Sequence, residues 1–131
     1  MAGYSGKPLF QKLGFKPGFL VWVRNAPDHY PQLLADAEGV EFVEGADRDA
    51  VHLFCPDRAT LDRDLEGSLA ALRAGGILWV SWAKKSSPLF SDVTEDTMRE
   101  VILPMGWVDV KVCAVDADWS GLKFLKRKSN A

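Results

Sequence analysis

Residues 77–82 read Ile77-Leu78-Trp79-Val80-Ser81-Trp82, an apolar run with a single serine near its end. A run that is apolar on both faces is typical of a strand covered by helices from both sides, as in parallel sheets. We therefore predict a central strand here. Gly75-Gly76 stands directly before it and is expected to end a helix that begins after an N-cap at Asp57. The leucines of that helix recur at helical spacing: Leu61, Leu65, Leu69 and Leu72.

Two further apolar runs, Phe19 to Val23 and Ala50 to Cys55, predict buried strands upstream of this one. Between them, Asn25 is expected to cap a helix that ends at Gly39, and residues 40–44 are expected to form a short strand. Helices between strands imply parallel pairing through right-handed crossovers. However, residues 45–49 are too few for a helical crossover, which needs about a dozen. Either an extended segment runs back along the sheet, or the 40–44 strand is antiparallel.

The C-terminal third changes character after a helix that Thr94 is expected to cap. Apolar residues at 108, 110, 112 and 114 alternate with Asp109, Lys111 and Cys113, which predicts a strand with one wet face. A polar turn and a basic return strand over 122–128 complete an antiparallel hairpin. The predicted fold is a single α/β domain over residues 1–131: a three-layer, mostly parallel sheet with helices on both faces and a C-terminal antiparallel hairpin.

Composition narrows the classes of function. Among the 131 residues 47% are apolar and 26% charged, and the net charge is -2, so no overall basic field favours a nucleic-acid partner. The apolar runs are shorter than the ~20 residues of a membrane helix, and residues 1–6 lack a signal-peptide pattern, so we expect a cytoplasmic protein without a membrane partner. Two distant cysteines and two histidines predict neither a disulfide nor a metal site.

The order of parallel strands, helices and terminal hairpin resembles the fold of the S-adenosylmethionine-dependent methyltransferases, and residues 72–81 resemble the segment that enters the fifth strand of that family. Over nearly the whole chain, the sequence also resembles a bacterial family of small proteins known only as a domain of unknown function. This resemblance implies a methyltransferase-like, Rossmann-type fold and no established activity. The segments that carry it are Gly3-Tyr4-Ser5-Gly6, Asn25-Ala26-Pro27, Val51-His52-Leu53-Phe54, Gly75-Gly76 with Val80-Ser81-Trp82, Lys84-Lys85-Ser86-Ser87, residues 109–116 and Trp119-Ser120-Gly121-Leu122-Lys123.

Ligands of open α/β sheets bind beyond the carboxyl ends of the strands. The candidate ligand-binding residues expected there are Asn25, Asp28, His29, Glu44, Asp57, Lys84, Lys85, Ser86 and Ser87. The turn over residues 24–30 contains no glycine, and Pro27 removes a backbone N–H. This composition argues against the close backbone approach that a dinucleotide or S-adenosylmethionine needs, and it favours an ordinary capped helix start.

The other candidates carry specific chemistry. Glu44 could accept hydrogen bonds from ribose hydroxyls, and the segment 84–87 offers cations and hydroxyls for a phosphate or carboxylate, without the glycines of a Walker motif. His29 could serve as a general base, but its neighbour Asp28 would not face it on a helix, so a surface histidine is the preferred interpretation. His52 is interpreted as a hydrogen-bonded core residue. No base that would activate Cys55 is evident, so no catalytic residue and no metal ligand are predicted.

These observations favour a non-catalytic or ligand-sensing binding protein on a reduced methyltransferase-like scaffold, which works through a protein partner or self-association. The alternative is a small-molecule enzyme or binder with an anionic or nucleotide-like ligand of the S-adenosylmethionine type at the carboxyl ends of the strands. Whether the protein is an enzyme stays open on the sequence alone, and no cofactor is assigned.

Overall fold

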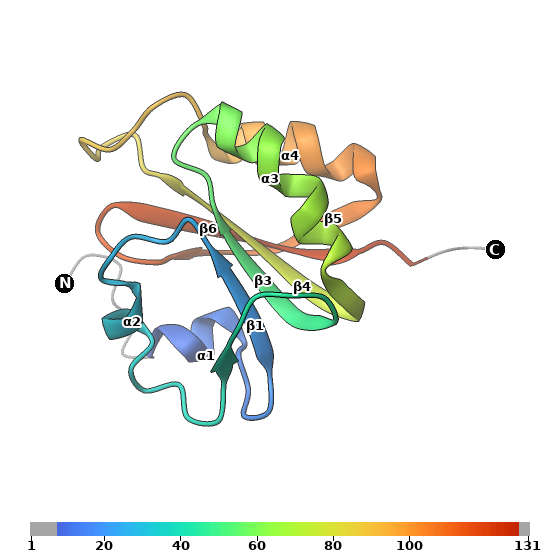
Figure 1. The fold of residues 1–131 in the computed structure, drawn as a ribbon. Helices are drawn as coiled ribbons and strands as arrows, with labels where there is room; N and C mark the ends of the chain where they lie inside the picture. Colours follow the sequence, from blue (N-terminus) through green and yellow to red (C-terminus); the bar gives the residue numbers. More distant parts are fainter. Residues whose placement is uncertain (1–7, 129–131) are drawn as a thin grey trace.

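The computed structural model describes residues 8–128, which form one six-stranded sheet in the order β2-β1-β3-β4-β6-β5 (Figure 1). The strands are β1 (Leu20–Arg24), β2 (Glu41–Phe42), β3 (Arg48–Phe54), β4 (Leu72–Ala83), β5 (Trp107–Ala114) and β6 (Trp119–Lys126). The helices are α1 (Leu9–Leu13), α2 (Tyr30–Leu33), α3 (Arg58–Ala70), α4 (Glu95–Ile102) and the 3-10 turn η1 (Leu103–Met105).

The sheet is parallel over four strands and antiparallel at its C-terminal end. β1 pairs in parallel with β2 and β3, and β3 pairs in parallel with β4, whereas β6 runs antiparallel between β4 and β5. Helices α3 and α4 cover one face, and α1 and α2 lie against the other (Figure 1). The predicted fold class is therefore confirmed.

β4 is the central strand that its apolar run predicted. Leu78, Trp79 and Val80 are completely buried, and the indole Nε1 of Trp79 donates a 2.8 Å hydrogen bond to the carbonyl of Leu13, which fastens α1 to the sheet. The prediction that Gly75-Gly76 ends the preceding helix is wrong. α3 ends at Ala70, and the two glycines lie inside β4, where the strand bulges between the Arg48–Leu72 and Ala50–Ile77 pairs. Gly75 supplies the positive φ, +79°, that this bulge requires.

The predicted long helix after β1 is also wrong, because only Tyr30–Leu33 are helical and no side chain caps them. Asn25 has a φ of +60°, and its side chain bonds to α3 and β3 instead of capping α2. Pro27 and Pro31 lack the N–H groups that a longer helix would use. Tyr30 and Leu34 still bury their side chains against the sheet.

β2 is parallel to β1, so the extended-segment alternative is the correct one. β1 lies between β2 and β3 in the sheet, and residues 43–47 carry the chain from one side of β1 to the other without a helix (Figure 1). Positive φ values at Gly45 (132°) and Asp47 (59°) turn this crossing segment. The short connection leaves β2 as an edge strand of two residues.

The side-chain alternation predicted for β5 does not hold along the whole strand. Val110 and Val112 are each 49% exposed, whereas Trp107 is buried in the core under α3 and α4 and Cys113 in the core on the other face of the sheet. The pairing with β6 shifts by one residue between Asp109 and Lys111. Because side chains alternate between the faces of a strand, the extra residue reverses the faces of the residues that follow it.

The core also contains three polar side chains, Tyr30, His52 and Ser81, that form hydrogen bonds with one another. The hydroxyl of Tyr30 and Nδ1 of His52 are 2.9 Å apart, and Nε2 of His52 and Oγ of Ser81 are 2.7 Å apart. His52 and Ser81 are fully buried, as the sequence predicted for the histidine. Burial lowers the pKa of His52 to about 3, so the imidazole is neutral.

Among the described residues, no helix is both long and apolar enough to cross a membrane.

Gly121→Ala is expected to destabilise the protein by about 1–3 kcal/mol, because the new Cβ would overpack this core. It would lie 3.2 Å from a ring carbon of Trp79 and 3.3 Å from Oγ of Ser81. Gly67→Ala, on an exposed position of α3, is the matched control and should be neutral or stabilising. Urea unfolding measures both variants, and equal stability of Gly121→Ala and wild type would contradict the packing described.

Candidate functional site

The place where this fold offers a ligand site is the crevice between the carboxyl ends of β1 and β3. The chain leaves β1 towards α2 on one face and leaves β3 towards α3 on the other, so the strand order reverses at this point (Figure 1). Ligands of open α/β sheets bind at such switch points because the loops diverge there and leave space.

At the carboxyl end of β1, polar side chains form hydrogen bonds across to β3 and α3. The amide Nδ2 of Asn25 donates to the carbonyl of Phe54 at 3.3 Å and to Oδ2 of Asp64 on α3 at 2.9 Å. The guanidinium of Arg24 donates to the carbonyl and to Oδ1 of Asp64, at 3.1 and 3.3 Å, and to Oγ of Ser68 at 2.8 Å. We call Arg24, Asn25 and Asp64 the crevice network.

Asp64 is the charged centre of this network. Hydrogen bonds from Arg63 lower the pKa of Asp64, and those from Asn25 and the charge of Arg24 act in the same direction, against the opposing effect of burial. The carboxylate is therefore ionised. Burial, assisted by the Asp64 and Asp57 carboxylates, raises the pKa of Cys55 to about 12, so its thiol stays protonated and is a poor nucleophile.

Asp57 and Glu44 lie on either side of this region with different roles. Oδ1 of Asp57 accepts hydrogen bonds from N and Oγ1 of Thr60, at 2.8 and 2.7 Å, which confirms Asp57 as the N-cap of α3. Glu44 lies exposed in the crossing segment, at a shallow hollow of about 290 Å³ that Trp22 and Phe42 also line. The structure does not bring the carboxylates of Asp57 and Glu44 into a shared set of contacts within residues 8–128.

The predicted anion segment, residues 84–87, is partly engaged elsewhere. Nζ of Lys84 donates to the carbonyl of Asp116 at 2.9 Å, and Oγ of Ser87 donates to Oδ1 of Asp118 at 2.9 Å. These bonds hold the β5–β6 hairpin turn against the end of β4. Lys85 and Ser86 remain exposed, so the phosphate or carboxylate site rests on fewer groups than the sequence offered and stays a prediction.

His29 has a partner that sequence reasoning missed. Its Nε2 lies 2.6 Å from Oδ2 of Asp116, 87 positions away, whereas the neighbouring Asp28 lines an apolar hollow. Oδ1 of Asp116 also accepts from the backbone N–H of Asp118 and Trp119, both at 2.8 Å. Burial tends to raise the pKa of Asp116, but the His29 and backbone hydrogen bonds outweigh it, and the pKa lies below its ordinary value.

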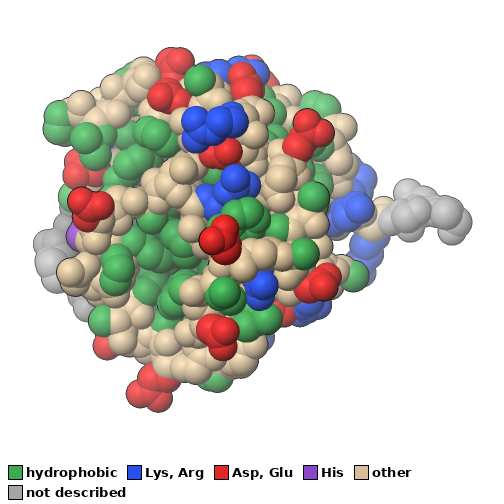
Figure 2. Space-filling view, in the orientation of Figure 1, with side chains coloured by type: hydrophobic (Ala, Val, Ile, Leu, Met, Phe, Trp, Pro, Cys, Tyr) green, Lys and Arg blue, Asp and Glu red, His purple; other side chains and the backbone are tan. Residues whose placement is uncertain are grey.

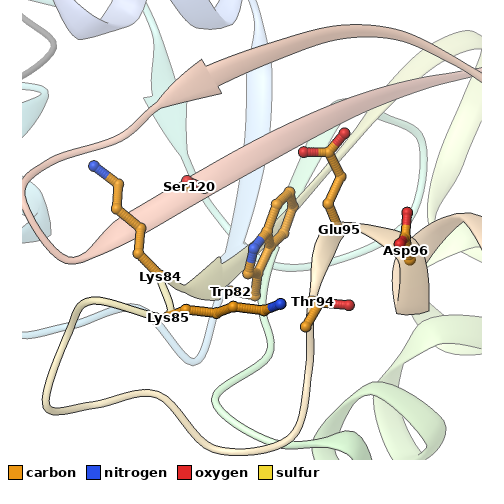
Figure 3. A pocket seen from close by; sticks show the side chains of 7 residues that line it. All are labelled: Trp82, Lys84, Lys85, Thr94, Glu95, Asp96 and Ser120. Atoms are coloured by element: carbon orange, nitrogen blue, oxygen red, sulfur yellow. The ribbon is translucent and has the colours of Figure 1, made fainter.

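Two larger hollows lie beside these groups. The first, of about 400 Å³, is the Trp82 hollow, which is lined by Trp82, Lys84, Lys85, Thr94, Glu95, Asp96 and Ser120 (Figure 3). The second, of about 610 Å³, is the Phe42 hollow, which lies between α2 and the ends of β1 and β2 and is almost entirely apolar. Figure 2 shows apolar side chains gathered in that region of the surface. Among the described residues, no group of three or more histidine, cysteine, aspartate or glutamate side chains could hold a metal ion.

No protein-family model and no curated protein matches the chain. Several solved structures have a similar fold. A Burkholderia thailandensis 1,6-didemethyltoxoflavin-N1-methyltransferase, with bound 1,6-didemethyltoxoflavin and S-adenosylhomocysteine, matches 92% of this chain and 75% of its own, with a TM-score of 0.59 and 16% identity. The [4+2]-cyclase SpnF matches 92% of this chain and 79% of its own, with a TM-score of 0.64 and 10% identity.

A third similar structure, an Aquifex aeolicus SAM-dependent methyltransferase, matches 95% of this chain and 90% of its own, with a TM-score of 0.61 and 10% identity. At sequence identities this low, the similarity shows a shared fold and does not show a shared reaction. The comparisons therefore show that this chain has a methyltransferase-like Rossmann fold.

Asp116→Asn is expected to cost about 1 kcal/mol of unfolding free energy at pH 7, through the weaker bond to His29. A carboxylate with a lowered pKa stabilises the folded state above the pKa of the unfolded chain, about 3.9, and this contribution disappears as the pH falls through the folded pKa. The difference between wild type and variant should therefore shrink below pH ~4. Thermal unfolding from pH 3 to 7 measures it, with the exposed Asp36→Asn as control. A difference independent of pH would contradict this role of Asp116.

Proposed function

We propose that the protein is a non-catalytic binding protein on a reduced methyltransferase-like scaffold. The observation that carries the proposal is the crevice network, in which Arg24 and Asn25 at the end of β1 are bonded to Asp64 on α3, beside the position where this fold offers a ligand site. A cofactor entering there would have to separate a buried carboxylate from its hydrogen-bond donors. Breaking such bonds without replacing them costs about 1.5–3 kcal/mol each.

The backbone around the crevice supports the same conclusion. No glycine lies between Arg24 and Tyr30, and Pro27 has no N–H to offer a ligand. The residues present therefore do not fit S-adenosylmethionine in the manner that glycine-rich turns allow. Neither Cys55, which is protonated, nor the pair of His29 and Asp116, which lacks a neighbouring nucleophile among its hydrogen-bond partners, supplies a catalytic set.

We further propose that the protein works by self-association of its two sheet edges. Each edge exposes apolar side chains: Phe42 (42%) and Val43 (38%) at the β2 end, and Val110 and Val112 at the β5 end. Among the described residues, no further strand pairs with β2 on its outer side. Exposed apolar side chains on an unpaired edge strand favour association with another chain.

The two edges also carry opposite charge. Exposed acids lie on and beside β2, together with Lys16 and Arg48, and exposed bases lie on β5 and at the end of β6. The acids are Asp36, Glu38, Glu41, Glu44 and Asp47, and the bases are Lys111, Lys126, Arg127 and Lys128. Figure 2 shows Lys and Arg side chains grouped on the right-hand side, away from the β2 end. A second copy of this chain complements either edge, and such a head-to-tail contact forms rings or filaments.

A second candidate function, a binder or enzyme for an anionic or nucleotide-like small molecule, is supported by a different observation. Lys85 projects into the Trp82 hollow beside unpaired hydrogen-bond donors (Figure 3). The sequence placed an anion site in the same loop. This candidate does not require the crevice between β1 and β3.

S-adenosylhomocysteine is expected to bind with a dissociation constant weaker than about 1 mM, since the crevice network excludes it. Isothermal titration calorimetry should record no saturable heat, and the melting temperature should not rise with added ligand. A dissociation constant below about 100 μM, or methyl transfer from S-adenosylmethionine to any acceptor, would overturn the non-catalytic proposal.

Self-association is tested by exchanging the charges of the edges. Glu41→Lys with Glu44→Lys is expected to weaken the association about tenfold or more, because it places bases opposite bases. Adding Lys111→Glu and Lys126→Glu to the same chain should restore it, because both edges are then reversed. Sedimentation velocity at low and high salt measures the change. Glu66→Lys with Glu100→Lys, on the exposed faces of α3 and α4, is the matched control.

A monomer at every accessible concentration, or association that Glu41→Lys with Glu44→Lys leaves unchanged, would rule out the edge contact. Restoration by the fourfold exchange cannot be explained by misfolding of the first variant. Restored association would therefore show that the first variant lost the interface and kept its fold.

A further inference from the structure

The floor of the Trp82 hollow contains an unused hydrogen-bond donor. The hollow lies at the carboxyl end of β4, between the loop after that strand and the start of α4 (Figure 3). Trp82 is only 6% exposed, and its indole N–H has no hydrogen-bond partner among residues 8–128. The residue is otherwise packed in the core, so its unpaired N–H opens onto the hollow, where an acceptor can pair with it.

Two other donors line the hollow, Lys85 on the loop after β4 and Ser120 on β6 (Figure 3). The ammonium of Lys85 and the hydroxyl of Ser120 line the cavity, and neither has a hydrogen-bond partner in the part of the chain that the structure describes. Lys84 does not join them, because its amine turns away and donates to the carbonyl of Asp116 (Figure 3). An ammonium, an indole N–H and a hydroxyl together suit a carboxylate.

The α4 side of the hollow has the opposite charge. Glu95 and Asp96 form the first turn of α4, and a capping box between Thr94 and Thr97 satisfies the helix start. Glu95 is bound to Arg99 at 2.6 Å. Asp96 approaches Arg99 only to 3.8 Å, and its side chain is 87% exposed, so its carboxylate is available to a ligand.

We propose that the Trp82 hollow binds a small zwitterion, an amino acid or a related aminocarboxylate. Its carboxylate would meet Lys85, the Trp82 N–H and Ser120, and its ammonium would meet Asp96 and the face of the indole. A simple anion would be repelled by the acids of α4, and a simple cation by Lys85. A volume of about 400 Å³ accommodates a molecule of this size.

This inference does not depend on the crevice network or on edge association; it concerns the hollow of the second candidate function and names a zwitterion as its ligand in place of an anion. The hollow lies after β4 on the face that α4 covers, whereas the crevice network lies between β1 and β3. Binding of S-adenosylhomocysteine at the crevice and binding of an amino acid in the Trp82 hollow are measured separately. Either result can fail without the other.

The indole N–H signals of ¹⁵N-labelled protein provide the direct test. The five tryptophans give separate signals, and the Trp82 signal is the one that Trp82→Phe removes. The proteinogenic amino acids are added one at a time at about 10 mM, with acetate and methylamine as single-charge probes. We expect at least one amino acid to shift the Trp82 signal saturably, and neither acetate nor methylamine to do so.

Variants of the lining residues identify the contacts. Lys85→Ala is expected to weaken the binding of that amino acid about tenfold or more, whereas Lys16→Ala, an exposed lysine outside the hollow, should leave it unchanged. Asp96→Asn should remove the preference over acetate. Lys85 and Asp96 are surface side chains, so these variants should retain the melting temperature of the wild type.

The proposal is overturned if no amino acid shifts the Trp82 signal, or if Lys85→Ala binds as well as wild type. Binding of acetate as tight as that of the best amino acid would also overturn it, in favour of a plain anion site. Binding of S-adenosylhomocysteine at the crevice would bear on the proposed function alone, because it would leave the Trp82 signal unshifted.

Discussion

The buried carboxylate of Asp64 is the interaction on which the arrangement of this site depends. It lies on α3 and receives hydrogen bonds from Arg24 and Asn25 at the end of β1, so it joins elements that are distant in the sequence. A buried charge without such partners would be strongly destabilising. The contacts that satisfy it also hold the end of β1 against α3.

The short crossing segment explains why apolar side chains are exposed at the β2 edge of the sheet. Because residues 43–47 pass over β1 without a helix, the sheet ends at a strand of two residues whose apolar side chains are exposed. The opposite edge, at β5, is exposed for another reason, the register shift before Lys111. A methyltransferase-like fold is thus combined with exposed apolar side chains at both ends of the sheet. Similarity of fold does not fix function, since one scaffold serves many sites.

Several features were predictable because their causes are local. The apolar run at 77–82 predicted the central strand, and Asp57 and Thr94 were recognisable as helix caps from residue type and position. The glycine-free turn after β1 already argued against a standard cofactor. Predictions failed where a distant partner competed: Asn25 bonds to Asp64 instead of capping α2, and Gly75 shapes a strand bulge instead of ending α3. The regular alternation predicted for β5 failed because a one-residue shift after Asp109 reverses the faces of the side chains that follow it.

The sequence by itself determined the buried strands, the N-caps of α3 and α4, the absence of a glycine-rich turn after β1 and the charged groups at the carboxyl ends of the strands. These follow from the chemistry of neighbouring residues and their periodicity. Only the tertiary structure decided the pairing of those groups: His29 with Asp116, Lys84 with the hairpin turn, and Lys85 with the Trp82 hollow. Hydrogen bonds and ion pairs form over a few ångströms in space, and a residue's neighbours at that range are set by how the strands pair.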